Sequence, residues 1–410
     1  MVANCSTALV KTVDGTQAPV PGMLESGSET LKSRRRSWVE VSCRQIAENF
    51  CRVRAVVGPA VEIAPVVKAD AYGHGAIQTA RVLARVGARW LAVSNLEEGA
   101  VLRQSGYAGR ILVMADCLAF HDSALFELDL TPVIHSFADL AELDRMAKAA
   151  QRSMRYHLKV DTGMTRFGVP SQASEVLAAV REARAAELEG LMTHFASSTD
   201  YSSTQSEDQI ARLKALIGAL RHAGVVPYYI HLSSSNPVAY GRRPEWENMV
   251  RPGLAIYGYV LPARGLARPP LLDVKPALTW KATILAVRHV AAGARVGYGA
   301  LYRAPQGMRI GVLAVGYADG YPHSLSNHGI VIAGGKPAPV VGAVSMDVTT
   351  IDLSQAPHLS QAMRSPCSAR KATSHSMHSN SHAAPARFLT VCCATSTRGS
   401  SGCTWNSGVP

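Results

Sequence analysis

The strongest constraint on the fold is an alternation of short apolar, β-branched runs with longer segments of helical periodicity. The expected strands are 61–68, 90–94, 110–114, 131–134, 155–161, 188–193, 228–232 and 254–258. The helix-like segments between them are 76–86, 96–105, 137–151, 172–186 and 205–223. Because strands that alternate with helices pair in parallel, the eight runs predict an α/β domain folded as a (β/α)8 TIM-type barrel. A doubly wound sheet is the alternative, but its usual G-x-G-x-x-G turn does not occur.

The pattern changes after Pro269-Pro270, where strand-like runs continue without a long helix. These runs are 278–290, 309–317, 329–333 and 340–351. Glycine and proline separate them, as in β-rich folds. The sequence therefore predicts four regions, namely a flexible leader (1–37), a barrel (38–272), an incomplete β-rich domain (273–354) and an atypical tail (355–410).

The tail differs from the rest of the chain in composition. Residues 361–410 contain ten Ser and four Cys, and no Asp or Glu follows Asp352. Such a segment is typical of a disordered extension. Its abrupt loss of pattern also suggests a hypothesis, that the segment is coding sequence read in a shifted frame. Met23 is a second candidate for the true start of the chain.

Charge and cysteine content exclude several classes of function. The formal net charge of +12 resides largely in the two flanks, without interleaved aromatic residues, so we expect no nucleic-acid partner. No apolar run approaches the ~20 residues of a membrane span. The eight cysteines form no C-x-x-C pair and there is no H-E-x-x-H, so we expect no metal site. Few, scattered cysteines in the body predict a reduced, cytoplasmic protein.

The end of the first expected strand carries the most informative side chain, Lys68 in VVKADAYGHG (66–75). In a barrel, catalytic groups lie at the carboxyl ends of strands. A lysine there is partly desolvated, which disfavours its charged form and suits a lysine that bonds covalently to a carbonyl cofactor.

This string resembles the signature around the cofactor lysine of alanine racemases, the fold-type III pyridoxal-phosphate enzymes. Matching strings follow in the same order over about residues 38–352. They are KVDTGMTRFG (159–168), THF (193–195), HLSSSN (231–236), RPGLAIYG (251–258), VGYG (296–299), VGYADGYP (315–322) and SMD (345–347).

The resemblance implies pyridoxal-phosphate-dependent interconversion of L- and D-alanine, which supplies D-alanine for peptidoglycan. It implies two catalytic bases, Lys68 and Tyr298, on opposite faces of the amino acid's Cα. Racemisation needs such a pair because one group removes the α-proton and the other returns it from the opposite side. A racemase for another amino acid such as serine, or a non-catalytic pyridoxal-phosphate-binding barrel, remains an alternative.

The resemblance also implies which residues hold the cofactor and the substrate. The cofactor-binding set is Lys68, Tyr72, His194, His231, Ser235, Arg251, Gly253 and Leu254. The substrate-binding set is Arg166, Met346, Asp347 and Tyr317. The counterpart of Arg251 faces the pyridine nitrogen, where a guanidinium can only donate. In several relatives the lysine that matches Lys159 is carbamylated.

The family assembles as a head-to-tail homodimer, and the resemblance implies that Tyr298, Met346 and Asp347 enter the site from the second subunit. One feature departs from the family. Relatives supply a further phosphate-contacting tyrosine near the C-terminus, but this chain has no Tyr after Tyr321. Loss of the closing strands would expose sheet edges and weaken the dimer.

Overall fold

A computed structural model describes residues 36–115, 123–242, 246–265, 269–359 and 403–405. Most of the predicted leader and most of the tail therefore lie outside the described residues. The chain divides into two compact units. Among the described residues, the first unit is Cys43–Ala277, and the second comprises 36–42 and the residues from Leu278 onward.

The first unit alternates strands and helices along a curled parallel sheet, as predicted. Strands β3 to β8 form one six-stranded sheet in sequence order, and β2 pairs in parallel with β9. The strands are β2 (Glu62–Ile63), β3 (Trp90–Val93), β4 (Arg110–Val113), β5 (Thr131–Ile134), β6 (Met154–Lys159), β7 (Ala186–Met192), β8 (Tyr229–His231) and β9 (Met249–Val250). The helices are α2 (Cys43–Val57), α3 (Lys68–Gly73), α4 (Ala76–Arg85), α5 (Leu96–Gln104), α6 (Ala124–Glu127), α7 (Phe137–Ala149), α8 (Ala173–Glu182), α9 (Gln205–His222) and α10 (Ser235–Ala239).

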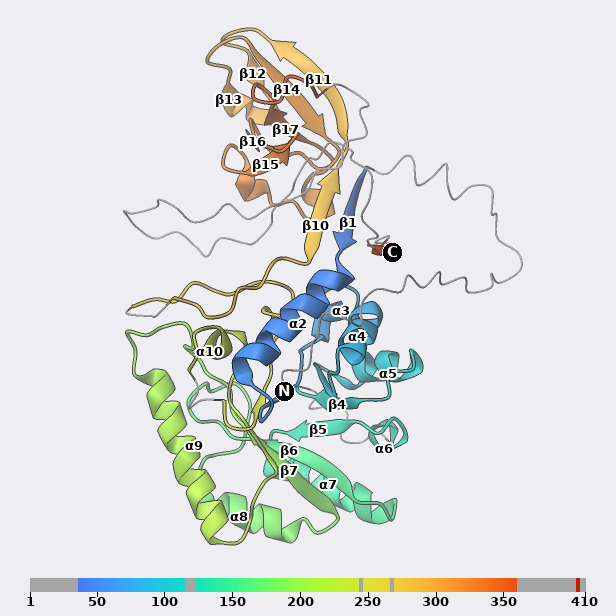
Figure 1. Cartoon of the computed structure of the whole chain (residues 1–410), viewed down its shortest axis with the longest axis vertical. Coiled ribbons are helices and arrows are strands. Elements are labelled where there is room, and N and C mark those ends of the chain that lie inside the picture. The colour runs from blue at the N-terminus through green and yellow to red at the C-terminus, as the bar shows by residue number, and fades with distance from the viewer. Residues whose placement is uncertain (1–35, 116–122, 243–245, 266–268, 360–402, 406–410) are drawn as a thin grey trace, which may run out of the picture. The chain divides into compact units, whose positions relative to one another are not determined.

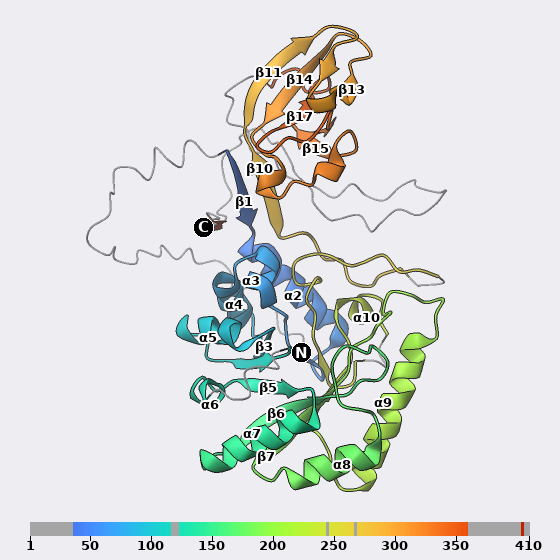
Figure 2. The ribbon, with the colours of Figure 1, turned by 180° about the vertical axis from the view of Figure 1, so that it is seen from behind.

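Local sequence explains where these helices begin and end. The Asn95 side chain accepts from the backbone N–H of Glu98 at the start of α5, and Ser136 caps α7 in the same way. Gly87 and Gly106, which follow α4 and α5, have φ of +87° and +86°, a conformation that glycine adopts without a steric penalty. The helices lie along the outside of the sheet (Figures 1 and 2).

The interior of the curled sheet is an apolar cluster. Its buried members are Ala64, Val66, Trp90, Ala92, Leu112, Val133, Met192 and Met249. Strands β3 and β5 are buried along their whole length, as expected for parallel strands covered on both faces. The cluster draws on strands from both the six-stranded sheet and the β2–β9 pair.

The prediction of a strand at 254–258 is wrong. The last strand of the first unit is β9, which begins five residues earlier. The apolar run Leu254–Gly258 forms tight turns instead. The backbone N–H groups of Ile256 and Tyr257 donate to the carbonyls three residues before them. A short apolar run fits a buried turn as well as a strand, so its composition alone could not distinguish them.

The second unit is β-rich, as predicted. One sheet orders β10–β1–β18 and another orders β11–β14–β17, while β12–β13 and β15–β16 are hairpins. Its elements are β1 (Ser37–Val41), β10 (Leu278–Ala282), β11 (Ile284–Val290), β12 (Arg295–Val296), η4 (Tyr298–Ala300), β13 (Tyr302–Arg303), β14 (Met308–Leu313), η5 (Tyr317–Asp319), η6 (His323–Leu325), β15 (Ile330–Ala333), β16 (Lys336–Pro339), β17 (Thr349–Asp352) and β18 (Cys403–Trp405).

The first described residues, 36–42, belong to the second unit because β1 pairs with strands of that unit. β1 pairs antiparallel with β10 on one side and with β18 on the other. The predicted barrel boundaries at 38 and 272 thus differ by about five residues from the compact unit Cys43–Ala277. β18 is a strand that the sequence did not predict in the tail, and it pairs with an edge of β1 that no other described strand covers.

Candidate active site

A cavity of about 370 Å³ opens at the carboxyl ends of the strands of the first unit. Eight of the predicted site residues line it. They are Lys68, Tyr72, Arg166, His194, Ser235, Arg251, Gly253 and Leu254. The predicted His231 is fully buried and contacts Arg251, without lining the cavity. The volume and the few polar groups that converge on it are typical of a small-molecule site.

Lys68 is presented by an unusual turn. The four residues that follow it, Ala69 to Tyr72, all have positive φ, between 50° and 56°. Such a left-handed turn costs L-residues about 1–2 kcal/mol each. Hydrogen bonds offset this strain, because the backbone N–H of Ala69 donates to Glu98 Oε1 at 2.7 Å and that of Ala76 donates to Asp70 Oδ1 at 2.7 Å. The half-buried Lys68 is thus held at the mouth of the sheet by residues of α5 and its own loop.

The buried side chain of Arg251 is held by histidine nitrogens and backbone carbonyl oxygens that accept its hydrogen bonds. Arg251 is 3% exposed, and its guanidinium donates to His231 Nδ1 at 2.5 Å and to the Thr193 carbonyl at 2.9 Å. A longer contact of 3.3 Å joins Arg251 Nη2 to His194 Nδ1. Burial lowers the pKa of Arg251 to about 9, so the group stays protonated at neutral pH.

Ser235 and Gly253 form a compact cradle on one side of the cavity. The Ser235 hydroxyl accepts from the backbone N–H groups of Gly253 and Ala255, both at 3.0 Å. A Cβ on Gly253 would lie 2.6 Å from the Tyr72 hydroxyl oxygen, so only glycine permits this approach. Hydroxyl and amide groups so arranged suit a phosphate group.

Arg166 lies in a loop that follows β6. The Asp161 carboxylate organises this loop by accepting from the backbone N–H groups of Gly163, Met164 and Thr165 at 2.9–3.0 Å. The Arg166 side chain is exposed and free to meet an anionic group that enters the cavity. A guanidinium matches the two oxygens of a carboxylate.

The cavity is electropositive. Burial lowers the pKa of His194 and, together with the charges of Arg251, Lys159, Arg166 and Lys68, brings it to about 3. His194 is therefore neutral at physiological pH. Four cations around one neutral histidine favour a ligand that carries negative charge.

The four remaining predicted residues lie in the second unit. Tyr298 begins η4 and is 77% exposed, while Met346 is 55% exposed. The backbone N–H of Tyr317 donates to the Ser345 carbonyl, and Arg36 donates to the Asp347 carbonyl at 3.3 Å. The structure thus brings Tyr317 beside the Ser345–Asp347 segment, and it leaves these side chains open to solvent.

Several lining residues escaped the sequence prediction. Ser94, Met114 and Met192 line the cavity. Each lies at or next to the end of a predicted strand, which is the signal that would have found them. Phe167 follows the predicted Arg166, and the Lys159 ammonium lies 5.5 Å from the centre of its ring.

Comparison with known proteins agrees with the predicted resemblance. The family model "Alanine racemase, N-terminal domain" matches residues 41–261, and "Alanine racemase, C-terminal domain" matches residues 277–398. An alanine racemase of Halothermothrix orenii is 37% identical over 325 residues, which cover 79% of this chain and 84% of that protein. The chain belongs to the alanine racemase family. The second match continues beyond residue 354, where the sequence predicted the β-rich domain to end.

Solved alanine racemases share the fold. The enzyme of the D-cycloserine producer Streptomyces lavendulae is 31% identical and has a TM-score of 0.71, with 78% of this chain and 84% of that chain covered. A Bartonella henselae alanine racemase, 24% identical with a TM-score of 0.70 over 80% of this chain and 88% of that one, holds covalently bound pyridoxal phosphate. Alanine racemases are an isomerase family that binds this cofactor. No helix in the described ranges is long and apolar enough to cross a membrane.

Proposed function

We propose that this chain interconverts L- and D-alanine with pyridoxal phosphate as cofactor and two bases, Lys68 and Tyr298. The observation that carries the proposal is that Lys68 and Arg251 line one electropositive cavity, with Arg251 held by neutral histidines. The alanine racemase family provides the chemistry that such a cavity serves.

The residues of the cavity fit the cofactor. Gly253 leaves space beside Tyr72 that a Cβ would fill, and Ser235 organises the backbone amides around it. These groups would hold the phosphate, Lys68 would hold the carbonyl carbon, and Arg251 would face the ring nitrogen. When bound, pyridoxal phosphate withdraws electrons from the amino acid's Cα and makes the α-proton acidic.

The chain's own residues then divide the work. Lys68 Nζ takes or returns the proton at Cα on one face, and Tyr298 Oη does so on the other. Arg166 binds the substrate carboxylate, and Met346 with Asp347 borders the substrate. Arg251 can only donate, so it would leave the ring nitrogen unprotonated and would keep the withdrawal of electrons moderate. Moderate withdrawal of electrons would limit side reactions such as transamination.

A head-to-tail homodimer completes the proposal, in which Tyr298, Met346 and Asp347 serve the cavity of the partner subunit. The support is the exposure of Tyr298 and Met346, since exposed side chains of this size suit a surface that another copy covers. Tyr317 would narrow the entry route, and a carbamylated Lys159 would position Arg166. We place the reaction in the cytoplasm, where D-alanine would supply peptidoglycan synthesis.

We further propose that the eight parallel strands close into a (β/α)8 barrel. Backbone hydrogen bonds at both seams support closure. The N–H of Val67 donates to the Ala92 carbonyl beside β3, and the N–H of Arg251 donates to the Ser233 carbonyl beside β8.

The test is D-alanine formation from L-alanine by the full chain with added pyridoxal phosphate, with L-serine as a second substrate. Lys68→Ala is expected to abolish turnover and to prevent borohydride from fixing the cofactor to the protein. Lys214→Ala, on the exposed face of α9, is the matched control. Cofactor fixed at Lys68 without turnover would instead indicate a non-catalytic barrel, and faster turnover of serine would indicate a different substrate.

A further inference from the structure

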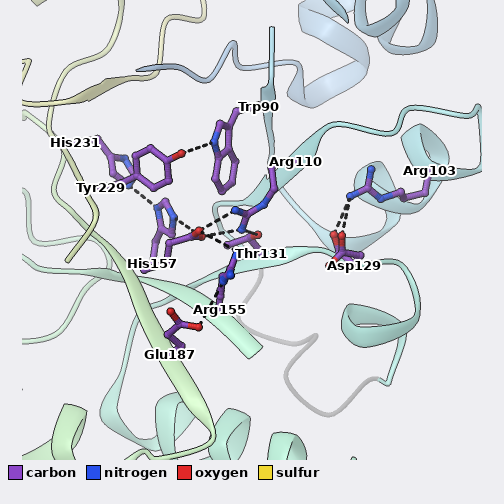
Figure 3. Close-up of polar contacts among 11 residues, drawn as sticks. Trp90, Arg103, Arg110, Asp129, Thr131, Arg155, His157, Glu187, Tyr229 and His231 are labelled. Atoms are coloured by element: carbon purple, nitrogen blue, oxygen red, sulfur yellow. Dashed lines mark hydrogen bonds and ion pairs between the residues drawn. The ribbon is translucent and has the colours of Figure 1, made fainter. Parts of the chain in front are cut away.

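A row of polar side chains runs through the otherwise apolar interior of the sheet. His231 Nε2 lies 2.7 Å from His157 Nδ1, and His157 Nε2 lies 3.4 Å from Glu189 Oε2. Arg110 donates hydrogen bonds to both carboxylate oxygens of Glu189, at 2.8 and 2.7 Å. Figure 3 shows the line from His231 through His157 to Arg110. Because His231 bonds Arg251, the polar row (Arg251, His231, His157, Glu189 and Arg110) connects the cavity to the opposite end of the sheet.

A β-bulge places Glu189 in this row. Tyr156 pairs with Leu188 and His157 pairs with Gly190, so Glu189 is an additional residue in β7. Bulges redirect a side chain in this way. Gly190 makes room for the imidazole, since a Cβ there would lie 2.5 Å from His157 Nδ1.

The direction of each hydrogen bond in the row follows from its ends. Arg251 can only donate, so His231 accepts at Nδ1 and carries its proton at Nε2. His157 must then accept at Nδ1 and carry its own proton at Nε2. His157 Nε2 lies 3.4 Å from Glu189 Oε2 without hydrogen-bond geometry, so the carboxylate favours a proton at Nε2 through its charge.

The protonation states of the row agree with this order. Burial lowers the pKa of His231 and of His157, which keeps both rings neutral. Burial alone would raise the pKa of Glu189, but the contact with His157 and the hydrogen bonds and charge of Arg110 bring it down to about 2. Glu189 is therefore an ionised group that can only accept.

We propose that His157, Glu189 and Arg110 are positioning residues that fix the Nε2–H tautomer of His231 and so hold Arg251 in one orientation at the cavity. Arg110 keeps Glu189 in place as the terminal acceptor, and Glu189 at one end and Arg251 at the other favour the same order of protons. None of the three lines the cavity. What Arg251 faces rests on the proposed function, whereas the tautomer order does not.

Glu189→Gln tests the proposal, because the amide can turn its NH2 toward His157. His157 would then accept at Nε2 and carry its proton at Nδ1, facing His231. Glu187→Gln is the matched control on the same strand. It changes the same group, but the Glu187 side chain is 59% exposed and contacts Arg155 (Figure 3).

The readout is the tautomer of each ring, from long-range ¹H–¹⁵N spectra of the full chain labelled with ¹⁵N-histidine, with pyridoxal phosphate bound. Signals are assigned with His157→Asn. We expect Nε2–H for both rings in the wild type and in Glu187→Gln, and a shifted tautomer in Glu189→Gln. Glu189→Asp keeps the carboxylate and is expected to keep the wild-type tautomers.

An Nδ1–H tautomer of either ring in the wild type would overturn the proposal. So would identical spectra for Glu189→Gln and Glu187→Gln. If Glu189→Gln fails to fold, an Nδ1–H tautomer in the wild-type spectrum would still overturn the proposal. In the racemase assay, kcat of Glu189→Gln is expected to fall about tenfold with KM nearly unchanged, as for loss of an outer partner of a ligating histidine. A chain without racemase activity would contradict the proposed function and leave the tautomer result standing.

Discussion

Arg251 donates to His231 Nδ1 over 2.5 Å, and neither side chain contacts water to any great extent, with 3% and 0% exposure. A buried guanidinium normally needs a carboxylate. Here carbonyl oxygens of Thr193 and His231 and an imidazole nitrogen accept its hydrogen bonds instead. This leaves its charge unneutralised beside the cavity, where it can act on a ligand.

Replacing this arginine tests the importance of its planar geometry. Arg251→Lys keeps the charge but cannot reach the same acceptors, so buried acceptors lose their partners. We expect the free energy of unfolding to fall by about 1–3 kcal/mol and kcat/KM to fall at least about tenfold. Arg145→Lys, on the exposed face of α7, is expected to change stability by less than about 0.5 kcal/mol. Equal effects in urea unfolding would contradict the account.

Gly190→Ala probes the packing of His157. A Cβ at 190 would collide with the imidazole, which β6 and β7 hold in place, and such overpacking costs about 1–3 kcal/mol. Gly218→Ala, four residues before the end of α9, meets nothing within 4 Å and is expected to stabilise the helix by about 0.5–1 kcal/mol. Chemical denaturation of both variants measures whether each change raises or lowers the free energy of unfolding. A neutral Gly190→Ala would show that His157 can move freely.

Stability is expected to fall in mild acid. Burial and the nearby Lys159 charge lower the pKa of His135 to about 4, whereas an unfolded histidine titrates near 6.5. Between these values the unfolded chain binds more protons, so the free energy of unfolding decreases as pH decreases. Each such histidine contributes up to about 1.4 kcal/mol per pH unit.

His135→Phe isolates this contribution, because it keeps a ring against Phe167 and removes the titrating group. Urea midpoints of this variant are expected to depend less on pH than those of the wild type, within that window. Phe167→Leu alters the same ring contact without removing a titrating group, so it should retain the wild-type slope. If the urea midpoints of His135→Phe and the wild type depend equally on pH, His135 is excluded as a source of the pH dependence of stability.

Composite sites in a homodimer can be detected by mixing two inactive chains. Lys68→Ala and Tyr298→Phe each disable every site when alone. In a mixed dimer one site collects both changes and the other none, so an equal mixture that reassorts freely is expected to regain roughly one quarter of the wild-type activity. A mixture no more active than its components would contradict a shared site.

Much of the first unit could be predicted from its sequence, because strand and helix periodicities are strong there. The cavity residues at strand ends, such as Lys68 and His194, were found by that rule together with the family resemblance. The strand at 254–258 was misplaced because the backbone amides of Gly253 and Ala255 bond to Ser235, eighteen and twenty residues away. No local pattern contains that information.

Three members of the polar row escaped prediction for a related reason, namely His157, Glu189 and Arg110. His157 and Glu189 sit within apolar strands, and only the bulge in β7 turns both toward the same interior. Their roles depend on partners more than 30 residues apart in the chain. In the proposed homodimer, the positions of Tyr298 and Met346 in a site would likewise depend on a second subunit.

The most direct test of the central claim is racemisation of L-alanine in D₂O by the full chain with pyridoxal phosphate. Two bases predict that the D-alanine formed early carries solvent deuterium at Cα, while the remaining L-alanine keeps its hydrogen. Equal deuteration of both enantiomers from the start would contradict a two-base reaction, and a failure to form D-alanine would contradict the proposed function itself.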